Sequence, residues 1–157
     1  MIALPSPATV HGFWFGGSAT SPEVLKTHAP LWFKGGEAFD RLLTAQFQPL
    51  LETLSAGPLA RDWAARGPRE RLAAIIVLDQ MSRNIFRGSP RAFAQDMLAL
   101  HLCREGLAAG EDRALSETER VFFYLPLEHS EALADQEQSV ALFTRLADEA
   151  RDAFRDF

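Results

Sequence analysis

The chain has 157 residues, of which 47% are hydrophobic and 24% are charged. This length and composition predict a single folded domain spanning residues 1–157, and they exclude both a disordered chain and a small scaffold that depends on disulfides. The net charge is -5 at pH 7. Because the chain is acidic and shows no recognised nucleic-acid motif, we expect no nucleic-acid partner.

The charge is unevenly distributed along the chain. Residues 1–109 contain eleven Lys or Arg and nine Asp or Glu, whereas residues 110–157 contain five and twelve. Seven of the arginines lie within residues 61–91. We expect this local positive charge to attract either the acidic C-terminal part of the same domain or a small anionic ligand.

The single cysteine and the N-terminal residues indicate where the protein resides. Cys103 has no partner for a disulfide, which favours a reducing compartment, and we expect it to be a small buried hydrophobic residue. Residues 1–17 lack the basic and long apolar segments of a secretory signal. The longest strictly apolar run, residues 72–78, is too short to span a bilayer. The sequence therefore predicts a cytoplasmic protein without a membrane partner.

Aromatic residues dominate the first part of the chain. Residues 8–15 predict a short helix or an irregular anchor that covers one end of the core, followed by a polar loop ending near Pro22. We expect Trp32 and Phe33 to cover the core in the same way. Helical spacing begins at residue 37 and ends at the Gly57-Pro58 stop signal. Pro49 is expected to kink or divide this helix.

The stretch from Pro68 to Arg87 predicts the helix on which the other elements pack. It follows one or two helical turns at residues 59–65 and begins with Pro at its first position. Because it is apolar on nearly all sides, its neighbours must enclose it. Two charged residues, Asp79 and Arg83, interrupt this apolar surface. They are four residues apart, so they can pair along the helix.

A second helix is predicted from Pro90 to Ala109, antiparallel to the first. Gly88 and Ser89 form the tight turn, with Ser89 as the cap. Asp96 falls on the apolar face of this helix, at the level of Arg83. We predict that Asp79, Arg83 and Asp96 form one partly buried charge cluster, because an arginine between carboxylates keeps its donors paired. The predicted apolar stripe consists of Phe93, Met97, Leu100 and Leu107, with Cys103 at its edge.

The C-terminal part predicts two further helices. Ser116 and Glu119 have the spacing of a capping box for a short helix that Pro126 is expected to end. A final helix begins at about Ala132, and Gln136 lies in the middle of its apolar stripe. That stripe consists of Leu133, Val140, Phe143, Ala147, Ala150 and Phe154. Since no alternating run is long enough for a strand, the predicted fold class is all-α.

Residues 78–100 and 119–131 resemble the signature segments of DUF924, a family of uncharacterised bacterial proteins. The FWFG motif at 13–16, the WF pair at 32–33 and the segment DQEQSVALF at 135–143 are similar to the family as well. The resemblance implies a compact helical bundle built on a tetratricopeptide-like antiparallel hairpin, and it implies no known activity. Members usually continue into a segment of the RFGRFPHRN kind, which is absent here. A family site that uses that segment is therefore expected to be incomplete or supplied differently.

Several polar residues are candidates for one pocket between the helices. They are Asp79, Arg83, Asp96, Glu128, His129, Glu131 and Gln136. Carboxylates beside an arginine and a histidine can bind an anion and transfer protons. The alternative is a structural cluster in which these groups satisfy one another and fix the helix register.

Arg87 with the Gly88-Ser89 turn is a second candidate, because backbone donors at a helix N-terminus can receive a phosphate or carboxylate. The alternative here is a tight turn with a solvated arginine. His101 with Glu105 lies toward the polar side of its helix, and His129 with Glu128 or Glu131 is an unspecific ligand set. We therefore expect no metal and no cofactor.

Three functional hypotheses follow from these residues. The first is a domain that binds a small anionic molecule or a peptide end through the Arg-carboxylate pocket. The second is a hydrolase or lyase in which His129 with Glu128 or Glu131 transfers protons and Arg83 anchors the substrate. The third is a purely structural interaction module that contacts its partner through the aromatic N-terminal segment. The sequence does not indicate the oligomeric state.

Overall fold

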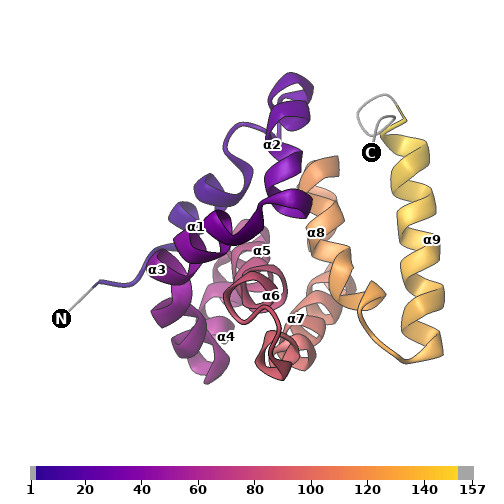
Figure 1. Ribbon diagram of the computed structural model, residues 1–157. Helices are drawn as coiled ribbons and strands as arrows, with labels where there is room; N and C mark the ends of the chain where they lie inside the picture. Colours follow the sequence, from indigo (N-terminus) through magenta and orange to yellow (C-terminus); the bar gives the residue numbers. More distant parts are fainter. Residues whose placement is uncertain (1–2, 152–157) are drawn as a thin grey trace.

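The computed structural model describes residues 3–151, and every regular element within them is helical (Figure 1). The predicted all-α class is confirmed. The α-helices are α1 Pro7–Phe15, α2 Pro22–Lys34, α3 Gly36–Ser55, α4 Pro58–Arg66, α5 Pro68–Ile75, α6 Ser82–Ile85, α7 Asp96–Ala108, α8 Glu117–Glu128 and α9 Leu133–Glu149. Shorter turns are η1 Ile76–Met81, η2 Pro90–Phe93 and η3 Glu111–Ala114. Within residues 3–151, no helix is both long and apolar enough to cross a membrane.

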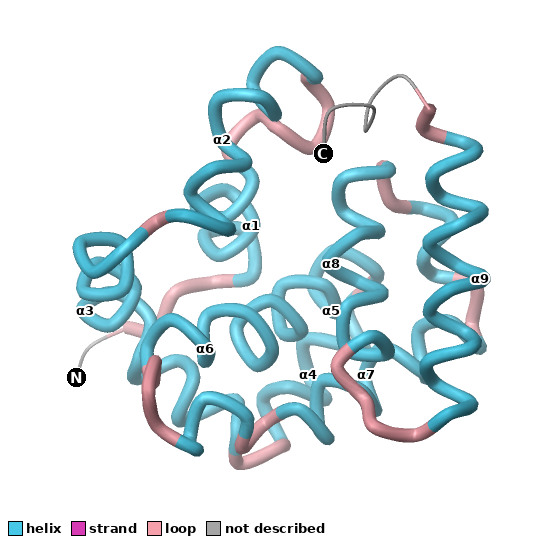
Figure 2. Tube along the Cα trace, turned by 45° about the vertical axis from the view of Figure 1, so that its right-hand side comes forward, coloured by secondary structure: helices cyan, strands magenta, loops and turns pink. Residues whose placement is uncertain are grey.

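The centre of the molecule is the segment formed by α5, η1 and α6. Every residue from 72 to 78 has an exposed fraction of 0%. Helices α1, α3, α4, α7 and α8 all contact this segment, which runs between them in Figure 2. The prediction of an enclosed central helix is confirmed.

The central helix also contains a feature that its hydrophobic pattern does not predict. Residues 76–81 form a π-helical turn, in which hydrogen bonds join residues five apart. Such a turn holds one more residue than an α-helical turn, so it changes the direction in which the following side chains point.

The predicted antiparallel hairpin is confirmed by the contacts between its two halves. Arg83 pairs with Asp96 near the turn, whereas Arg71 donates to the backbone carbonyl of Leu102 farther along. The second half is not one helix from 90 to 109, however. It is divided into the 3-10 turn η2 and the helix α7.

This division changes which side of the second half is buried. Phe93 and Met97, predicted to be in the apolar stripe, have exposed fractions of 58% and 74%. Cys103 lies in the middle of the buried face of α7, with an exposed fraction of 0%. Its burial as a small hydrophobic residue is confirmed, while its predicted place at the edge of the stripe is wrong.

Prolines divide the helices less than expected. Helix α3 continues through Pro49, and α8 continues past Pro126 to Glu128. A proline removes one backbone donor, but burial of an amphipathic face supplies most of a helix's stability in a folded protein. On α3 this face includes Phe47, Leu50 and Leu54, which are fully buried.

The N-terminal aromatic residues cover the core as predicted, with one exception. Trp14 and Phe15 in α1 and Trp32 in α2 are buried and meet the ring of Phe122 in α8. Phe33 is instead 59% exposed. No helix is predicted from the sequence for residues 22–34, yet α2 occupies them. The N-cap of α2 is Ser21, whose hydroxyl accepts a hydrogen bond from the Val24 amide, and serine is a typical N-cap residue.

Helix α9 packs on α8 at the edge of the molecule (Figure 1). The predicted stripe is wrong at Leu133 and Val140, which have exposed fractions of 73% and 66%. Ala147 is exposed as well. The buried positions are Asp135, Ser139, Leu146 and Ala150. The predicted stripe is thus confirmed at Ala150, and Phe143 packs partly buried against the core. Two of the buried positions are polar, and hydrophobic spacing does not select such positions. Phe154 lies outside the described residues.

The close packing of α5, α7 and α8 can be tested at Gly106. A Cβ atom there would lie 2.5 Å from the Phe123 ring and 2.7 Å from the side chain of Arg71. We expect Gly106→Ala to lower the free energy of unfolding by about 1–3 kcal/mol, since overpacking forces neighbours to move. Denaturant unfolding measures this change.

The matched control is Gly12→Ala, at an exposed glycine in α1 where a Cβ would meet nothing within 4 Å. It should raise the free energy of unfolding by about 0.5–1 kcal/mol, because alanine is the better helix former. Equal effects of the two substitutions would contradict the close packing at Gly106.

Candidate functional site

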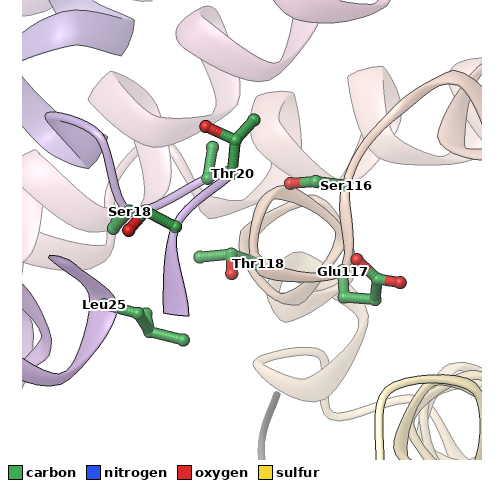
Figure 3. Close-up of a pocket in the computed structure, with 8 residues that line it drawn as sticks. Ser18, Thr20, Leu25, Ser116, Glu117 and Thr118 are labelled. Atoms are coloured by element: carbon green, nitrogen blue, oxygen red, sulfur yellow. The ribbon is translucent and has the colours of Figure 1, made fainter. Parts of the chain in front are cut away.

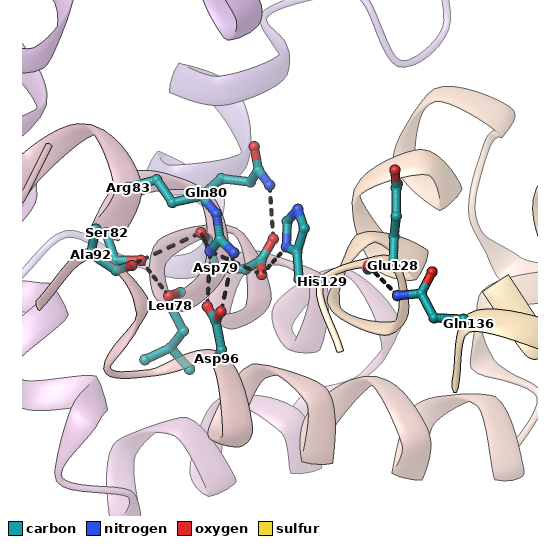
Figure 4. A network of polar contacts seen from close by, with 10 residues as sticks. All are labelled: Leu78, Asp79, Gln80, Ser82, Arg83, Ala92, Asp96, Glu128, His129 and Gln136. Carbon is teal, nitrogen blue, oxygen red and sulfur yellow. Dashed lines mark hydrogen bonds and ion pairs between the residues drawn. The ribbon is translucent and has the colours of Figure 1, made fainter. Parts of the chain in front are cut away.

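Asp79 is a fully buried carboxylate within the π-helical turn η1, with an exposed fraction of 0%. Three side chains surround its two oxygens (Figure 4). His129 Nδ1 lies 2.8 Å from Oδ1, and Gln80 Nε2 lies 2.8 Å from Oδ2. Arg83 Nη1 lies 3.5 Å from Oδ1. A buried charge is tolerated only when it is paired and hydrogen-bonded in this manner.

Arg83 joins Asp79 to the second half of the hairpin. Its Nη1 and Nη2 donate to Asp96 Oδ1 and Oδ2 at 2.8 and 3.1 Å, a bidentate pair. Nη1 also donates to the backbone carbonyl of Asp79 at 2.7 Å. The predicted cluster of Asp79, Arg83 and Asp96 is therefore confirmed as a structure. We call these three residues, together with Gln80 and His129, the Asp79 cluster.

His129 belongs to this cluster because it caps the C-terminus of α8 beside the central helix. Its side chain is 24% exposed. Since an ionised carboxylate only accepts hydrogen bonds, we assign the proton on the neutral imidazole to Nδ1. Nε2 then carries the lone pair. The contact with Asp79 thus fixes both the tautomer and the orientation of the ring.

Two of the predicted pocket residues point elsewhere. Gln136 donates from Nε2 to the backbone carbonyls of Glu128 and Ser130, at 2.6 and 2.5 Å. It therefore satisfies carbonyls that the end of α8 leaves without helical partners. The side chain of Glu128 is exposed. The structure does not bring Gln136 and Glu128 into one pocket with Asp79. Gln136 bonds to the α8–α9 connection, and Glu128 faces solvent.

On one side of the Asp79 cluster lies a hollow of about 500 Å³ between α7, the end of α8 and the start of α9. We call it the histidine groove. His129 and Asp96 line it, as does the exposed Glu131. Its remaining lining residues are Met97, Leu100, Arg104, Pro126, Ser130, Ala132 and Asp135.

Asp135 in this groove is a charged residue that sequence reasoning missed. Arg104 pairs with Asp135, and the Ser130 hydroxyl donates to Asp135 Oδ2 at 2.5 Å. The hydrogen bond from Arg104 is the main reason that the pKa of Asp135 lies below its usual value. These contacts fix the α8–α9 connection at the wall of the groove.

On the other side of the Asp79 cluster lies a hollow of about 580 Å³, which we call the arginine hollow. Arg83 and Arg87 line it together with the turn at 88–90, Ala92 and Phe93. The Arg83 guanidinium carbon lies 5.1 Å from the centre of the Phe93 ring. Two guanidinium groups and an apolar wall therefore share one hollow.

Arg87 is held in place by a residue that the sequence analysis did not identify. Its Nε and Nη2 donate to Asp40 of α3 at 2.6 and 3.1 Å, and Asn84 donates to the same carboxylate at 2.9 Å. The hydrogen bond from Arg87 is the main cause that lowers the pKa of Asp40, and the same bond raises the pKa of Arg87. No sequence signal connects positions 47 residues apart.

The helix N-terminus predicted after Ser89 is only partly present. Ser89 Oγ accepts from the Arg91 amide, but the element that follows, η2, is a single 3-10 turn of four residues. The dipole of one turn is much weaker than that of a full helix. Any anion in the arginine hollow would therefore depend mainly on the two guanidinium groups.

Other buried polar groups serve the fold rather than a pocket. Arg71 pairs with Glu111 and donates to the backbone carbonyl of Leu102. Glu119 completes the predicted capping box with Ser116, and its side chain also contacts His11. Burial raises the pKa of the Cys103 thiol to about 12, so the thiol stays neutral and a poor nucleophile near pH 7.

The described residues contain no group of three or more His, Cys, Asp or Glu side chains placed to hold a metal ion. The exposed pair His101 and Glu105 is 3.3 Å apart, on the polar side of α7 as predicted.

Comparison with known proteins places this fold in a family. The model of DUF924, bacterial proteins of unknown function, matches residues 10–156. The chain belongs to the DUF924 family. No curated protein matches it. A solved structure of a protein of unknown function, ATU0120 from Agrobacterium tumefaciens, is 32% identical with a TM-score of 0.76, covering 96% of this chain and 83% of that chain. This DUF924 domain thus shares its fold with a relative whose printed description assigns no activity.

The contribution of Arg83 to folding can be measured directly. Arg83→Gln leaves the buried Asp79 and the half-buried Asp96 without their shared cation. We expect the free energy of unfolding to fall by about 2–4 kcal/mol, near the range for breaking a buried pair. The midpoint of thermal unfolding should fall by roughly 5–15 °C.

The control is Arg91→Gln, at an exposed arginine that stacks on the Phe86 ring at 4.0 Å and forms no ion pair with another residue of the range 3–151. This substitution should change the free energy of unfolding by less than about 1 kcal/mol. If the two variants unfolded at the same temperature, the Asp79 cluster would not stabilise the fold.

Proposed function

We propose that this DUF924 protein is a cytoplasmic binding domain, and that its arginine hollow takes the anionic group of a small molecule or the carboxyl end of a peptide. The observation that carries the proposal is that Arg83 and Arg87 line the same hollow. Planar guanidinium groups pair well with carboxylates and phosphates.

Both guanidinium groups retain unused donors for a ligand. Arg83 uses both protons of Nη1 and one of Nη2 on Asp79 and Asp96, which leaves Nε and the second Nη2 proton. Arg87 uses Nε and one proton of Nη2 on Asp40. The pairing carboxylates hold both side chains in position, so less rotamer freedom is lost when a ligand binds.

The surroundings also favour a ligand with both an anionic and an apolar part. Phe93, exposed at 58%, forms a wall of the hollow beside Arg83. An exposed aromatic side chain next to cations suits a peptide end, whose carboxylate can face the arginines while its last side chain packs on the ring.

The test uses a mixture of N-acetylated tripeptides with free carboxyl ends, and the same mixture with amidated ends. We expect chemical-shift changes in Phe93 and in the turn at 88–90 with the free carboxyl form alone. Arg87→Gln should weaken this binding about tenfold or more, because hydrogen bonds between charged groups are the strong ones.

Arg91→Gln is the matched control, since Arg91 follows the same turn but does not line the hollow. Binding that is equal for both peptide forms, or equally weakened in both variants, would refute the proposal. If no peptide bound while Arg83→Gln still lowered stability, the Asp79 cluster would have a structural role alone.

A second candidate function, that of a hydrolase or lyase, is favoured by the contact between Asp79 and His129. A carboxylate that holds imidazole Nδ1 leaves Nε2 able to accept a proton from a substrate or a water molecule. His129 lines the histidine groove, where Glu131 is a second group for proton transfer. The exposed Glu128 does not line this groove. In this hypothesis Arg83 positions His129 through Asp79 and does not contact the substrate.

The probe for this activity is p-nitrophenyl acetate, which activated imidazoles hydrolyse. We expect His129→Gln to abolish the catalysed release of p-nitrophenol, and His101→Gln, at an exposed histidine on α7, to leave it unchanged. Asp79→Asn should reduce the rate by about tenfold or more, since it removes the group that fixes the tautomer. Equal rates for the two histidine variants would rule out a catalytic His129 on this probe.

A further inference from the structure

A third hollow, of about 300 Å³, lies between the α1–α2 connection and the start of α8 (Figure 3). It shares no residue with the Asp79 cluster or with the two hollows beside it. Its lining residues are Ser18, Ala19, Thr20, Ser21, Leu25, Ser116, Glu117 and Thr118. Five of these eight carry a hydroxyl group, so we call it the hydroxyl hollow.

Ser18 carries a buried hydroxyl that has no partner. The residue is 2% exposed, and its Oγ makes no hydrogen bond with any described residue. Buried polar groups in proteins are nearly always paired, and an unpaired one is destabilising. Figure 3 shows Ser18 on the α1–α2 side of the hollow, across from Thr118 of α8, which is 5% exposed. Because Ser18 lines the hollow, a rotation about its Cα–Cβ bond would bring this hydroxyl to a polar group of a ligand in this space.

The two helix caps at the hollow provide further donors. Ser21 caps α2 and Ser116 caps α8, and their hydroxyl oxygens accept from the amides of Val24 and Glu119 at 3.3 and 3.2 Å. A hydroxyl that accepts from a backbone amide still has its own proton to donate. The walls of the hollow therefore present hydroxyl groups that can both donate and accept.

The charge of the hollow limits the kind of ligand. No Lys, Arg or His is among its lining residues, whereas Glu117 contributes a carboxylate. That carboxylate repels an anion and accepts hydrogen bonds from ligand hydroxyls. Leu25 and Ala19 supply an apolar surface on which the C–H groups of a ligand can pack.

We propose that the hydroxyl hollow binds a neutral polyhydroxylated molecule, of the size of a monosaccharide or a cyclic polyol. Several neutral hydroxyls, one carboxylate and a small apolar patch are complementary to the alternating O–H and C–H surface of such a ligand. The volume lies at the lower end of the range for small-molecule sites. This proposal does not depend on the arginine hollow or on His129.

The experiment is a titration of the folded chain with D-glucose, D-ribose and myo-inositol, followed by the amide chemical shifts of residues 19, 20, 117 and 118. We expect saturable shifts at these amides with at least one of the three probes. Ser18→Ala and Thr118→Val should each weaken binding about three- to tenfold, the loss of one hydrogen bond. Thr27→Val, at an exposed threonine of α2 outside the hollow, should leave the affinity unchanged.

Sugars stabilise proteins generally by being excluded from their surfaces, so the readout is the saturable shift and not the melting temperature in sugar. Shifts that do not saturate, or that persist in both Ser18→Ala and Thr118→Val, overturn the proposal. Shifts produced by methylammonium or acetate but by none of the three neutral probes also overturn it.

The same variants show whether the Ser18 hydroxyl is free to serve a ligand. Without ligand, Ser18→Ala should keep or raise the midpoint of thermal unfolding, because it removes an unpaired buried group. A large fall would mean that the hydroxyl is needed for the fold, and this too would overturn the proposal.

Discussion

The negative charge of Asp79, enclosed at 0% exposure in the central helix, is the constraint on which the arrangement of the other helices depends. A buried carboxylate must be compensated by donors at fixed positions. Here the donors come from the same turn, from the next turn and from the end of α8, through Gln80, Arg83 and His129. Arg83 extends the network to Asp96 at the start of α7. One buried charge thus sets the relative positions of the central helix, α7 and α8.

The Asp79 cluster contributes residues to both of the hollows beside it. Arg83 lines the arginine hollow, whereas Asp96 and His129 line the histidine groove, and all three belong to the Asp79 network. If an anion drew Arg83 donors away from Asp96, the electrostatic field at Asp79 and at the His129 ring would change.

The limits of sequence reasoning follow from the range of each interaction. Asp79 and Arg83 are one helical turn apart, and Asp96 is one tight turn away, so spacing alone predicted their contact. Asp40 reaches Arg87 from another helix, and no local pattern encodes that pairing. Hydrophobic spacing did not predict the break between η2 and α7 at residues 94–95. It also did not predict that polar residues are buried on α9. Gln136 was recognised as a polar residue within the predicted apolar stripe, but its partners are backbone carbonyls, which every sequence offers equally.

The same criterion, whether a buried polar atom already has a partner, separates structural groups from ligand-binding groups throughout the molecule. The carboxylates of Asp79 and Asp135 are fully engaged by donors, so their first role is to hold helices together. Atoms that keep unused capacity are Nε2 of His129, the remaining donors of Arg83 and Arg87, and the hydroxyl of Ser18. Each of these lies at a hollow. Of these atoms only the Ser18 hydroxyl is both buried and unpaired, whereas the Arg87 side chain is 63% exposed and its free donors can bond to water. Burial without a partner is not sufficient to mark a binding group, because Trp14 Nε1 and Arg120 Nε are also buried and unpaired but line none of the three hollows. Ser18 differs from them in lying beside open space.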